Sequence, residues 1–151
     1  MDLDRLNRVL RRVRNEEPAA EERLVLERLI HAEAEACREY EYVRSRCSGR
    51  PQVVLTQIWT QEQKHYRDLQ AEYAARYGNS VPQSPEKPVG RGGVLSMLGR
   101  IREREFAAVE EYSRHGKATG DFRLSLLYQN HAREKRQHAK LLTQLLRQGM
   151  G

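Results

Sequence analysis

The chain has 151 residues, about one domain, with 38% hydrophobic residues, 32% charged residues and a net charge of +6. An aromatic content of only 7% beside so much charge favours long helices over a β-sandwich. We expect neither a membrane span nor secretion, because no apolar run approaches ~20 residues and the N-terminus lacks a signal peptide's apolar stretch. The two cysteines are too few for a disulfide framework, which predicts a cytoplasmic protein.

The positive charge is not specific enough to indicate nucleic-acid binding. Acidic residues are interspersed with the arginines almost everywhere, which is typical of solvated helix faces. The chain also has no helix-turn-helix signature and no aromatic stacking platform. We therefore do not expect nucleic acid as a partner.

Residues 1–17 form the first predicted unit. Leu3, Leu6, Leu10 and Val13 follow 3-4-3 spacing and the arginines lie mostly elsewhere, which predicts a short, basic amphipathic helix. Such a helix could contact anionic lipid or a partner. We favour instead that its leucines dock on the rest of the chain or on another subunit, which leaves a homo-oligomer open.

Residues 18–151 form the second predicted unit, with helical periodicity in four stretches and no alternating run that would indicate a strand. Pro18 is placed to open the first stretch. Glycines 49, 78, 116 and 149 lie where helices commonly stop. The sequence thus predicts an all-α fold, a four-helix bundle. Its expected helices are residues 18–47, 53–77, 94–115 and 120–148.

The connections predict the topology of this bundle. The first and last links are short, so each joins an antiparallel hairpin. Residues 78–93 are 16 residues rich in Pro and Gly, which can reach ~50 Å when extended. We expect a crossover that makes the second and third helices parallel.

Each predicted helix carries apolar residues at both ends of its inward stripe and polar residues near the middle. Several carboxylates in a dry core would repel one another, whereas a pair of divalent metal ions would neutralise them and accept oxygen and imidazole ligands. The alternative is a misphased stripe with some groups at the surface. The central residues are Glu33, Glu62, His65, Glu105, His131, Glu134 and His138.

An internal repeat supports the metal interpretation. Two hairpins related by a pseudo-twofold axis would bring both sets of Glu and His to one level. Leu26, Glu33 and Tyr40 recur 72 residues later as Leu98, Glu105 and Tyr112, and His65 recurs 73 later as His138.

Glu62-Gln63-Lys64-His65 is a Glu-x-x-His motif in the setting TQEQKHYRDL, and Glu33 and Glu105 each precede a Tyr by seven residues. Over about residues 20–148 the chain resembles the ferritin-like di-metal carboxylate proteins, the rubrerythrin group in particular, without a rubredoxin module. This resemblance implies a ferritin-like bundle with an iron or manganese pair. The ligands of that family are one Glu from each of two helices and a Glu-x-x-His from each of the other two.

One position departs from the family pattern. A second bridging Glu is expected at residue 135, three before His138, and the chain has Lys135 there. Glu134 could take over, since residues four apart also share a helix face, and His131 could be an added ligand. Otherwise Lys135 pairs with Glu62 or Glu33 and leaves one metal ion or none. Because we place Leu127, Glu134 and Leu141 on the inward stripe, we expect Lys135 to point outward.

The resemblance implies a metal-binding enzyme of the oxidase or peroxidase type, or a metal-handling protein. Glu33, Glu62, Glu105 and Glu134 would bridge or chelate two ions, with His65 and His138 as terminal ligands. Tyr40 and Tyr112 could hydrogen-bond the site or trap radicals, or only fill the core. Without cysteine pairs the chain would need an external electron donor. The alternative is a non-catalytic helical bundle whose degenerate metal site leaves it a binding or structural role.

Overall fold

The computed structural model describes residues 2–83, 89 and 92–149, apart from the side chains of residues 8 and 11–19. These residues form four α-helices and no strand, which confirms the all-α prediction. None of the described helices is both long and apolar enough to cross a membrane. The helices are α1 (Leu3–Ser45), α2 (Gly49–Tyr77), α3 (Val94–Ala118) and α4 (Phe122–Arg147).

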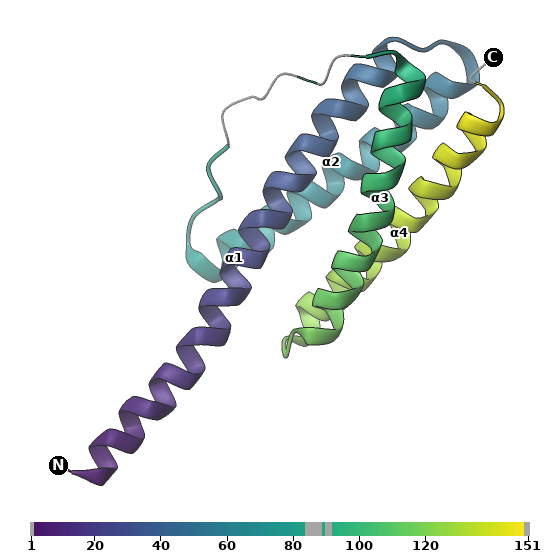
Figure 1. Ribbon diagram of the computed structural model, residues 1–151. Helices are drawn as coiled ribbons and strands as arrows, with labels where there is room; N and C mark the ends of the chain where they lie inside the picture. Colours follow the sequence, from purple (N-terminus) through teal and green to yellow (C-terminus); the bar gives the residue numbers. More distant parts are fainter. Residues whose placement is uncertain (1, 84–88, 90–91, 150–151) are drawn as a thin grey trace.

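The topology is the predicted one. Helices α1 and α2 form one antiparallel hairpin and α3 and α4 the other (Figure 1). Helices α2 and α3 run in the same direction, as the predicted crossover requires (Figure 1). The Gln70 side chain fixes the start of this crossover, because it accepts from the Val81 amide at 2.8 Å and donates to the Val81 carbonyl at 3.0 Å.

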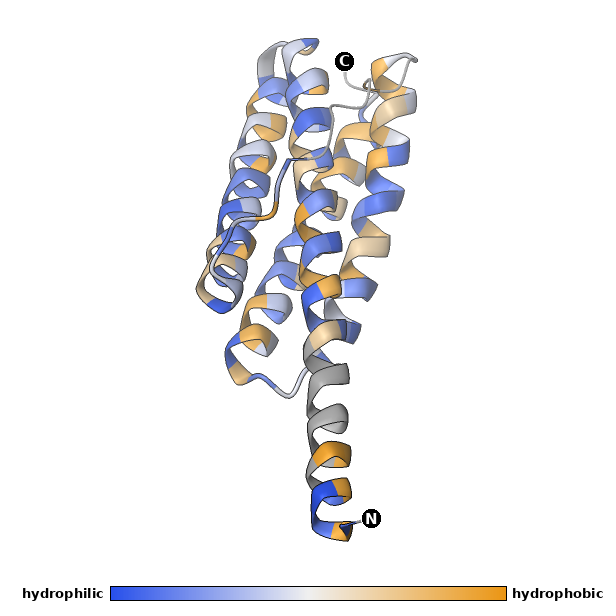
Figure 2. Cartoon of the chain, turned by 90° about the vertical axis from the view of Figure 1, so that its left-hand side faces the viewer, coloured by the Kyte–Doolittle hydropathy of each residue, from blue (hydrophilic) through white to orange (hydrophobic). Residues whose placement is uncertain are grey.

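The N-terminal helix is not a separate element. It is continuous with the first bundle helix, and residue 18, the proline expected to open that helix, lies inside α1. The beginning of α1 protrudes from the bundle and carries hydrophobic positions (Figures 1 and 2). The prediction that its leucines dock on the bundle is wrong for Leu3, Leu6 and Leu10, which are exposed, while the side chain of Val13 lies outside the described residues. The division at residue 17 stays a prediction.

Two glycines expected to follow helices lie inside them. Gly49 is the first residue of α2, with a φ of 64°, and α2 starts earlier than expected because Pro51 fits a first turn whose amides lack helical partners. Gly116 lies in the last turns of α3 against α4, where Ser125 Oγ donates to its carbonyl at 2.7 Å. Absence of a side chain there lets the two helices approach closely.

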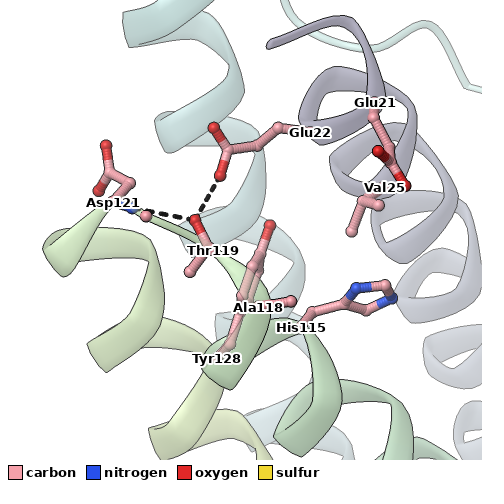
Figure 3. Close-up of a pocket in the computed structure, with 9 residues that line it drawn as sticks. Glu21, Glu22, Val25, His115, Ala118, Thr119, Asp121 and Tyr128 are labelled. Carbon is pink, nitrogen blue, oxygen red and sulfur yellow. Dashed lines mark hydrogen bonds between the residues drawn. The ribbon is translucent and has the colours of Figure 1, made fainter. Parts of the chain in front are cut away.

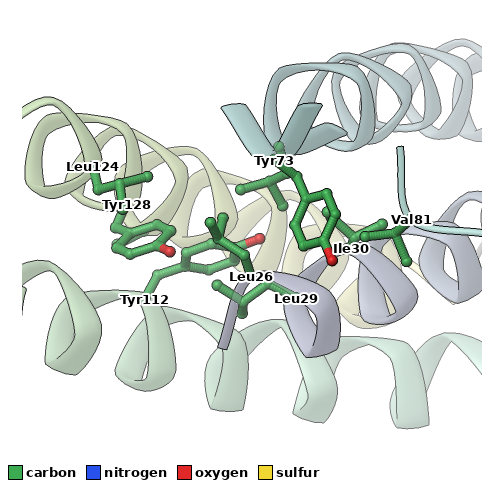
Figure 4. Packing of buried hydrophobic residues seen from close by; sticks show 10 residues of the cluster. Leu26, Leu29, Ile30, Tyr73, Val81, Tyr112, Leu124 and Tyr128 are labelled. Carbon is green, nitrogen blue, oxygen red and sulfur yellow. The ribbon is translucent and has the colours of Figure 1, made fainter. Parts of the chain in front are cut away.

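The core has two apolar layers with a polar layer between them. One apolar layer, seen in Figure 4, surrounds Tyr112 and Tyr128 and includes Leu26, Ile30, Leu69 and Leu124. The other lies toward the α1–α2 turn and includes Tyr40, Leu55, Ile58, Leu98, Ile101 and Leu142. This matches the predicted arrangement of apolar residues on both sides of a polar centre.

The inward stripe of α4 differs from the predicted one. Tyr128, Lys135 and Leu142 are buried, whereas Leu127, Glu134 and Leu141 are only partly buried. Both sets share Leu124, His131, His138 and Leu145, so the 3-4 pattern of apolar residues does not distinguish them. The shift by one residue decides which side chain enters the polar layer.

Candidate metal centre

All four helices contribute to the buried polar layer, and its residues are at most 3% exposed. The structure brings together Glu33 from α1, Glu62 and His65 from α2, Glu105 from α3, and Lys135 and His138 from α4. We call these six residues the central cluster.

Two sets of three residues in the central cluster can each hold a metal ion. In each set one ligand atom per residue lies within 4.8 Å of the others. Glu62 belongs to both sets, as a bridging carboxylate would. The sets are Glu33, Glu62 and His65, and Glu62, Glu105 and His138.

Lys135 points into the cluster, so the prediction that it faces solvent is wrong. Its Nζ lies 3.0 Å from Glu33 Oε1, 2.6 Å from Glu62 Oε2 and 3.8 Å from Glu105 Oε1. The physical reason is the stripe of α4, which turns residue 135 inward and residue 134 toward the rim. The ammonium therefore holds the place in which the family pattern puts a carboxylate.

The charges of the central cluster compensate one another. Burial alone would lower the pKa of Lys135, but the carboxylates of Glu105, Glu33 and Glu62 raise it above its ordinary value. Burial opposes ionisation of Glu62, yet Lys135 and several hydrogen bonds hold its pKa well below the usual range. Burial and the Glu62 charge raise the pKa of Glu33 well above its ordinary value, whereas Lys135 and the Tyr112 hydrogen bond act in the opposite direction.

His138 connects the cluster to the outside. Its Nδ1 lies 2.9 Å from Glu62 Oε1 and 3.6 Å from Glu105 Oε2, and its Nε2 lies 2.5 Å from Gln61 Oε1. Burial lowers the pKa of His138, but its hydrogen bonds and the charges of Glu105 and Glu62 raise it to about 9. A cavity of about 440 Å³ between α2 and α4 reaches His138 and Gln61.

His65 faces the carboxylates with one ring nitrogen and Glu134 with the other. Its Nε2 lies 2.7 Å from Glu134 Oε2, whereas Nδ1 has no hydrogen-bond partner among the described residues and lies 3.7 Å from Glu62 Oε2. Glu134 is thus on the far side of the imidazole from the carboxylates. It orients His65 but belongs to neither set of three.

His131 also stays outside both sets. Its ring stacks on His65 with a centroid distance of 4.1 Å, and both its ring nitrogens lack a hydrogen-bond partner among the described residues. Burial and the neighbouring His65 lower the pKa of His131 to about 2. It is a neutral, buried imidazole.

The two tyrosines singled out by the repeat make reciprocal contacts between the hairpins. Tyr40 in α1 donates to Glu105 Oε1 at 2.9 Å, and Tyr112 in α3 donates to Glu33 Oε1 at 2.6 Å. Burial and the adjacent carboxylate raise the pKa of each hydroxyl well above its ordinary value, so both stay protonated donors. Each tyrosine fixes a carboxylate of the opposite hairpin.

The donor set fits one metal ion better than two. Carboxylate oxygen and imidazole nitrogen suit iron and manganese, and the buried Glu105 Oε2 and His65 Nδ1 are without hydrogen-bond partners in the described structure. Lys135, however, occupies the space beside Glu33 and Glu62. Two divalent ions next to this ammonium would exceed the negative charge of the three carboxylates, so a metal pair does not fit.

The repeat in the sequence contains a signal for the inward orientation of Lys135, whereas no pattern in the sequence indicates Gln61. The 73-residue offset that relates His65 to His138 also relates Glu62 to Lys135. Equivalent positions of equivalent helices face the same axis, so the offset predicts an inward Lys135. Gln61, beside the Glu of the Glu-x-x-His motif, carries no such signal.

Comparison with known proteins supports the fold. No protein-family model and no curated protein matches the sequence. Among solved structures, a hypothetical protein from Pyrococcus furiosus is similar, with a TM-score of 0.71 and 20% sequence identity. The match covers 81% of this chain and 87% of that one. At this sequence identity the similarity shows a shared helical-bundle fold and does not indicate an activity.

Proposed function

We propose that this chain is a ferritin-like, rubrerythrin-like protein that binds one divalent iron or manganese ion at Glu62, Glu105 and His138. The observation that supports it is the convergence of Glu62 Oε1, Glu105 Oε2 and His138 Nδ1 in a buried layer that a cavity reaches from outside. Lys135 supplies the charge of the second ion of the family.

The residues around this set have defined tasks in metal binding. His138 gives up the proton on Nδ1 when it becomes a ligand, so the proton and the ion compete for the same atom. Gln61 accepts the hydrogen bond from Nε2 and thereby fixes the tautomer and the ring orientation. Tyr40 holds Glu105 through Oε1, which leaves Oε2 toward the ion.

A bound iron or manganese ion would supply redox chemistry toward oxygen or peroxide. Two cysteines, Cys37 and Cys47, are too few for a rubredoxin-like module, so reducing equivalents would come from an external electron donor. The proposed class is a metal-handling protein or an oxidoreductase of the rubrerythrin or ferroxidase type.

The second candidate is a non-catalytic bundle, and the ion pairs of Lys135 favour it. The ammonium neutralises Glu33 and Glu62 at 3.0 and 2.6 Å without any metal. In that case the central cluster is a structural polar layer.

Metal content per chain, measured by mass spectrometry on protein purified without chelator, separates the two candidates. We expect a value near one, its loss in Glu105→Gln, and a rise toward two in Lys135→Glu, which restores the family motif. Lys140→Glu, at an exposed position of the same helix, is the matched control. A wild-type value near zero that added iron or manganese does not raise would support the structural role.

A further inference from the structure

A second pocket lies at the opposite end of the bundle from the α1–α2 turn. It has a volume of about 470 Å³ and lies between α1, the end of α3, the α3–α4 turn and α4 (Figure 3). We call it the end pocket. Its wall includes Glu21, Glu22, Val25, His115, Thr119 and Tyr128.

The end pocket is acidic. Among the residues whose side chains the structure describes, neither Glu21 nor Glu22 forms an ion pair and no Lys or Arg lines the pocket, although the Arg76 charge acts on Glu22 from nearby. Asp121, also in the wall, is already paired with Arg76 at 2.9 Å. Burial lowers the pKa of His115, so this side chain adds no compensating charge at neutral pH. The pocket therefore favours a cation.

The hydrogen bonds of the turn fix one of these carboxylates. Thr119 Oγ1 donates to Glu22 Oε1 at 2.5 Å and accepts from the Asp121 amide at 3.2 Å (Figure 3). Glu22 is thereby held at the pocket wall through one oxygen. The position of the charge is set by the fold before any ligand arrives.

Tyr128 provides an independent indication of a ligand. The residue is 1% exposed, and its hydroxyl has no hydrogen-bond partner among the described residues. In Figure 3 the hydroxyl points into the space that Glu22 and Val25 border. Burial and the Glu22 charge raise the pKa of Tyr128, so the hydroxyl stays neutral and its oxygen can accept a hydrogen bond. Buried polar groups normally have partners, and a ligand that donates would supply one.

The geometry favours an organic cation over a metal ion. Within the described residues, the only groups of ligand atoms close enough to chelate an ion are the two in the central cluster. The volume is in the range of small-molecule sites. Val25 and Ala118 provide apolar surface for an alkyl chain.

We propose that the end pocket binds a small aliphatic amine, whose ammonium group donates hydrogen bonds to the Tyr128 hydroxyl oxygen and to the Glu22 carboxylate. This site is separate from the proposed metal site. Tyr112, which donates to Glu33, lies between them, with its ring centroid 6.0 Å from that of Tyr128.

Calorimetric titration with 1,4-diaminobutane tests the proposal. We expect saturable binding at one site per chain, weakened at least tenfold in both Glu22→Gln and Tyr128→Phe. Glu103→Gln removes an exposed carboxylate elsewhere on α3 and should bind like the wild type. The neutral diol of the same length, 1,4-butanediol, should not bind.

Two results would overturn the proposal. One is a Tyr128→Phe variant that binds the diamine like the wild type. The diamine would then be attracted only by the general negative charge of the pocket and not by a hydrogen bond to the Tyr128 hydroxyl. The other is a ligand-free Tyr128→Phe variant that melts well below the wild type, because this would reveal an internal partner of the hydroxyl. The Glu22→Gln variant changes a residue near the surface, so it keeps the titration interpretable even if Tyr128→Phe folds poorly.

Discussion

Lys135 is the residue on which the chemistry of this bundle depends. A single ammonium lies within 4.0 Å of Glu33, Glu62 and Glu105, which belong to three different helices. An ammonium is a compact point charge with three donors, so it can serve these carboxylates but cannot share them with an ion at the same place. Lys135 thus gives the buried carboxylates an internal counter-charge.

Removal of this counter-charge should destabilise the metal-free protein. Lys135→Ala is expected to lower the free energy of unfolding by about 3–5 kcal/mol, because it leaves buried carboxylates without their partner. Lys135→Met, which keeps a long side chain but removes its charge, should lower the free energy of unfolding nearly as much. Urea unfolding in the presence of a chelator measures this.

Lys140→Ala, at an exposed position of α4, is the control and should change stability by no more than about 0.5 kcal/mol. If Lys135→Ala unfolds like this control, the ion pairs of Lys135 contribute nothing to the free energy of unfolding, and the carboxylates of the central cluster do not depend on its charge.

His131 makes the stability of the protein depend on pH. Its pKa is about 2 in the folded state, against about 6.5 in an unfolded chain, so below pH 6.5 only the unfolded state takes up the proton. The contribution of neutral His131 to the free energy of unfolding is present above pH 6.5. It is lost as the pH falls below this value, by up to about 1.4 kcal/mol per pH unit.

His131→Phe should therefore reduce the loss of stability between pH 7 and 5.5. It also removes two buried nitrogens without partners, so at pH 7 we expect a gain of about 1–3 kcal/mol. Urea unfolding of both proteins at the two pH values gives the comparison. An identical pH dependence in the variant would show that His131 is protonated in the fold.

At the scale of the elements, the α3–α4 hairpin depends on close approach at one glycine. A Cβ at Gly116 would lie 3.2 Å from Gln129 Cγ and 3.5 Å from Tyr128 Cβ, whereas a Cβ at Gly99, in the same helix, would meet nothing within 4 Å. The two positions thus separate helix propensity from packing.

Gly99→Ala should stabilise the protein by about 0.5–1 kcal/mol, because Ala loses less conformational entropy in a helix. Gly116→Ala should give a smaller stabilisation or none, since the side chains of α4 have to move to make room for the added methyl group. Thermal unfolding of the two variants tests the difference. Equal stabilisation by both would mean that the hairpin tolerates a methyl group at residue 116.

At the scale of the whole molecule, the start of α1 requires an explanation. Leu3 is 73% exposed and Leu10 is 44% exposed, on a stretch of helix that extends beyond the bundle (Figure 2). Short helices without tertiary contacts are marginal in water. A second copy of the chain that covers this stripe would stabilise the helix, which is the homo-oligomer left open by the sequence.

We therefore expect an oligomer in solution that the double variant Leu6→Lys, Leu10→Lys dissociates. Leu126→Lys, which alters an exposed leucine of α4, should leave the oligomer intact. Light scattering after gel filtration measures the mass of each. A wild-type protein that is monomeric at 100 μM would contradict this expectation.

The sequence by itself determined the class of fold and most of the central cluster. Apolar residues at helical spacing on both sides of Glu33, Glu62 and Glu105 placed these carboxylates inward, because burial of the flanking leucines fixes the face of each helix. The length of residues 78–93 determined the crossover, since a chain of that reach is not needed for a turn. The repeat placed both histidines at one level.

The apolar periodicity of α4 did not decide which face of this helix turns inward; packing in the tertiary structure did. Two stripes of α4 share Leu124, His131 and Leu145 and differ by one residue in between, so their apolar patterns are nearly equivalent. Packing against the other three helices selects the stripe with Tyr128 and Lys135, where the ammonium meets Glu33 and Glu62. That choice depends on charges from distant parts of the chain, which no local periodicity contains.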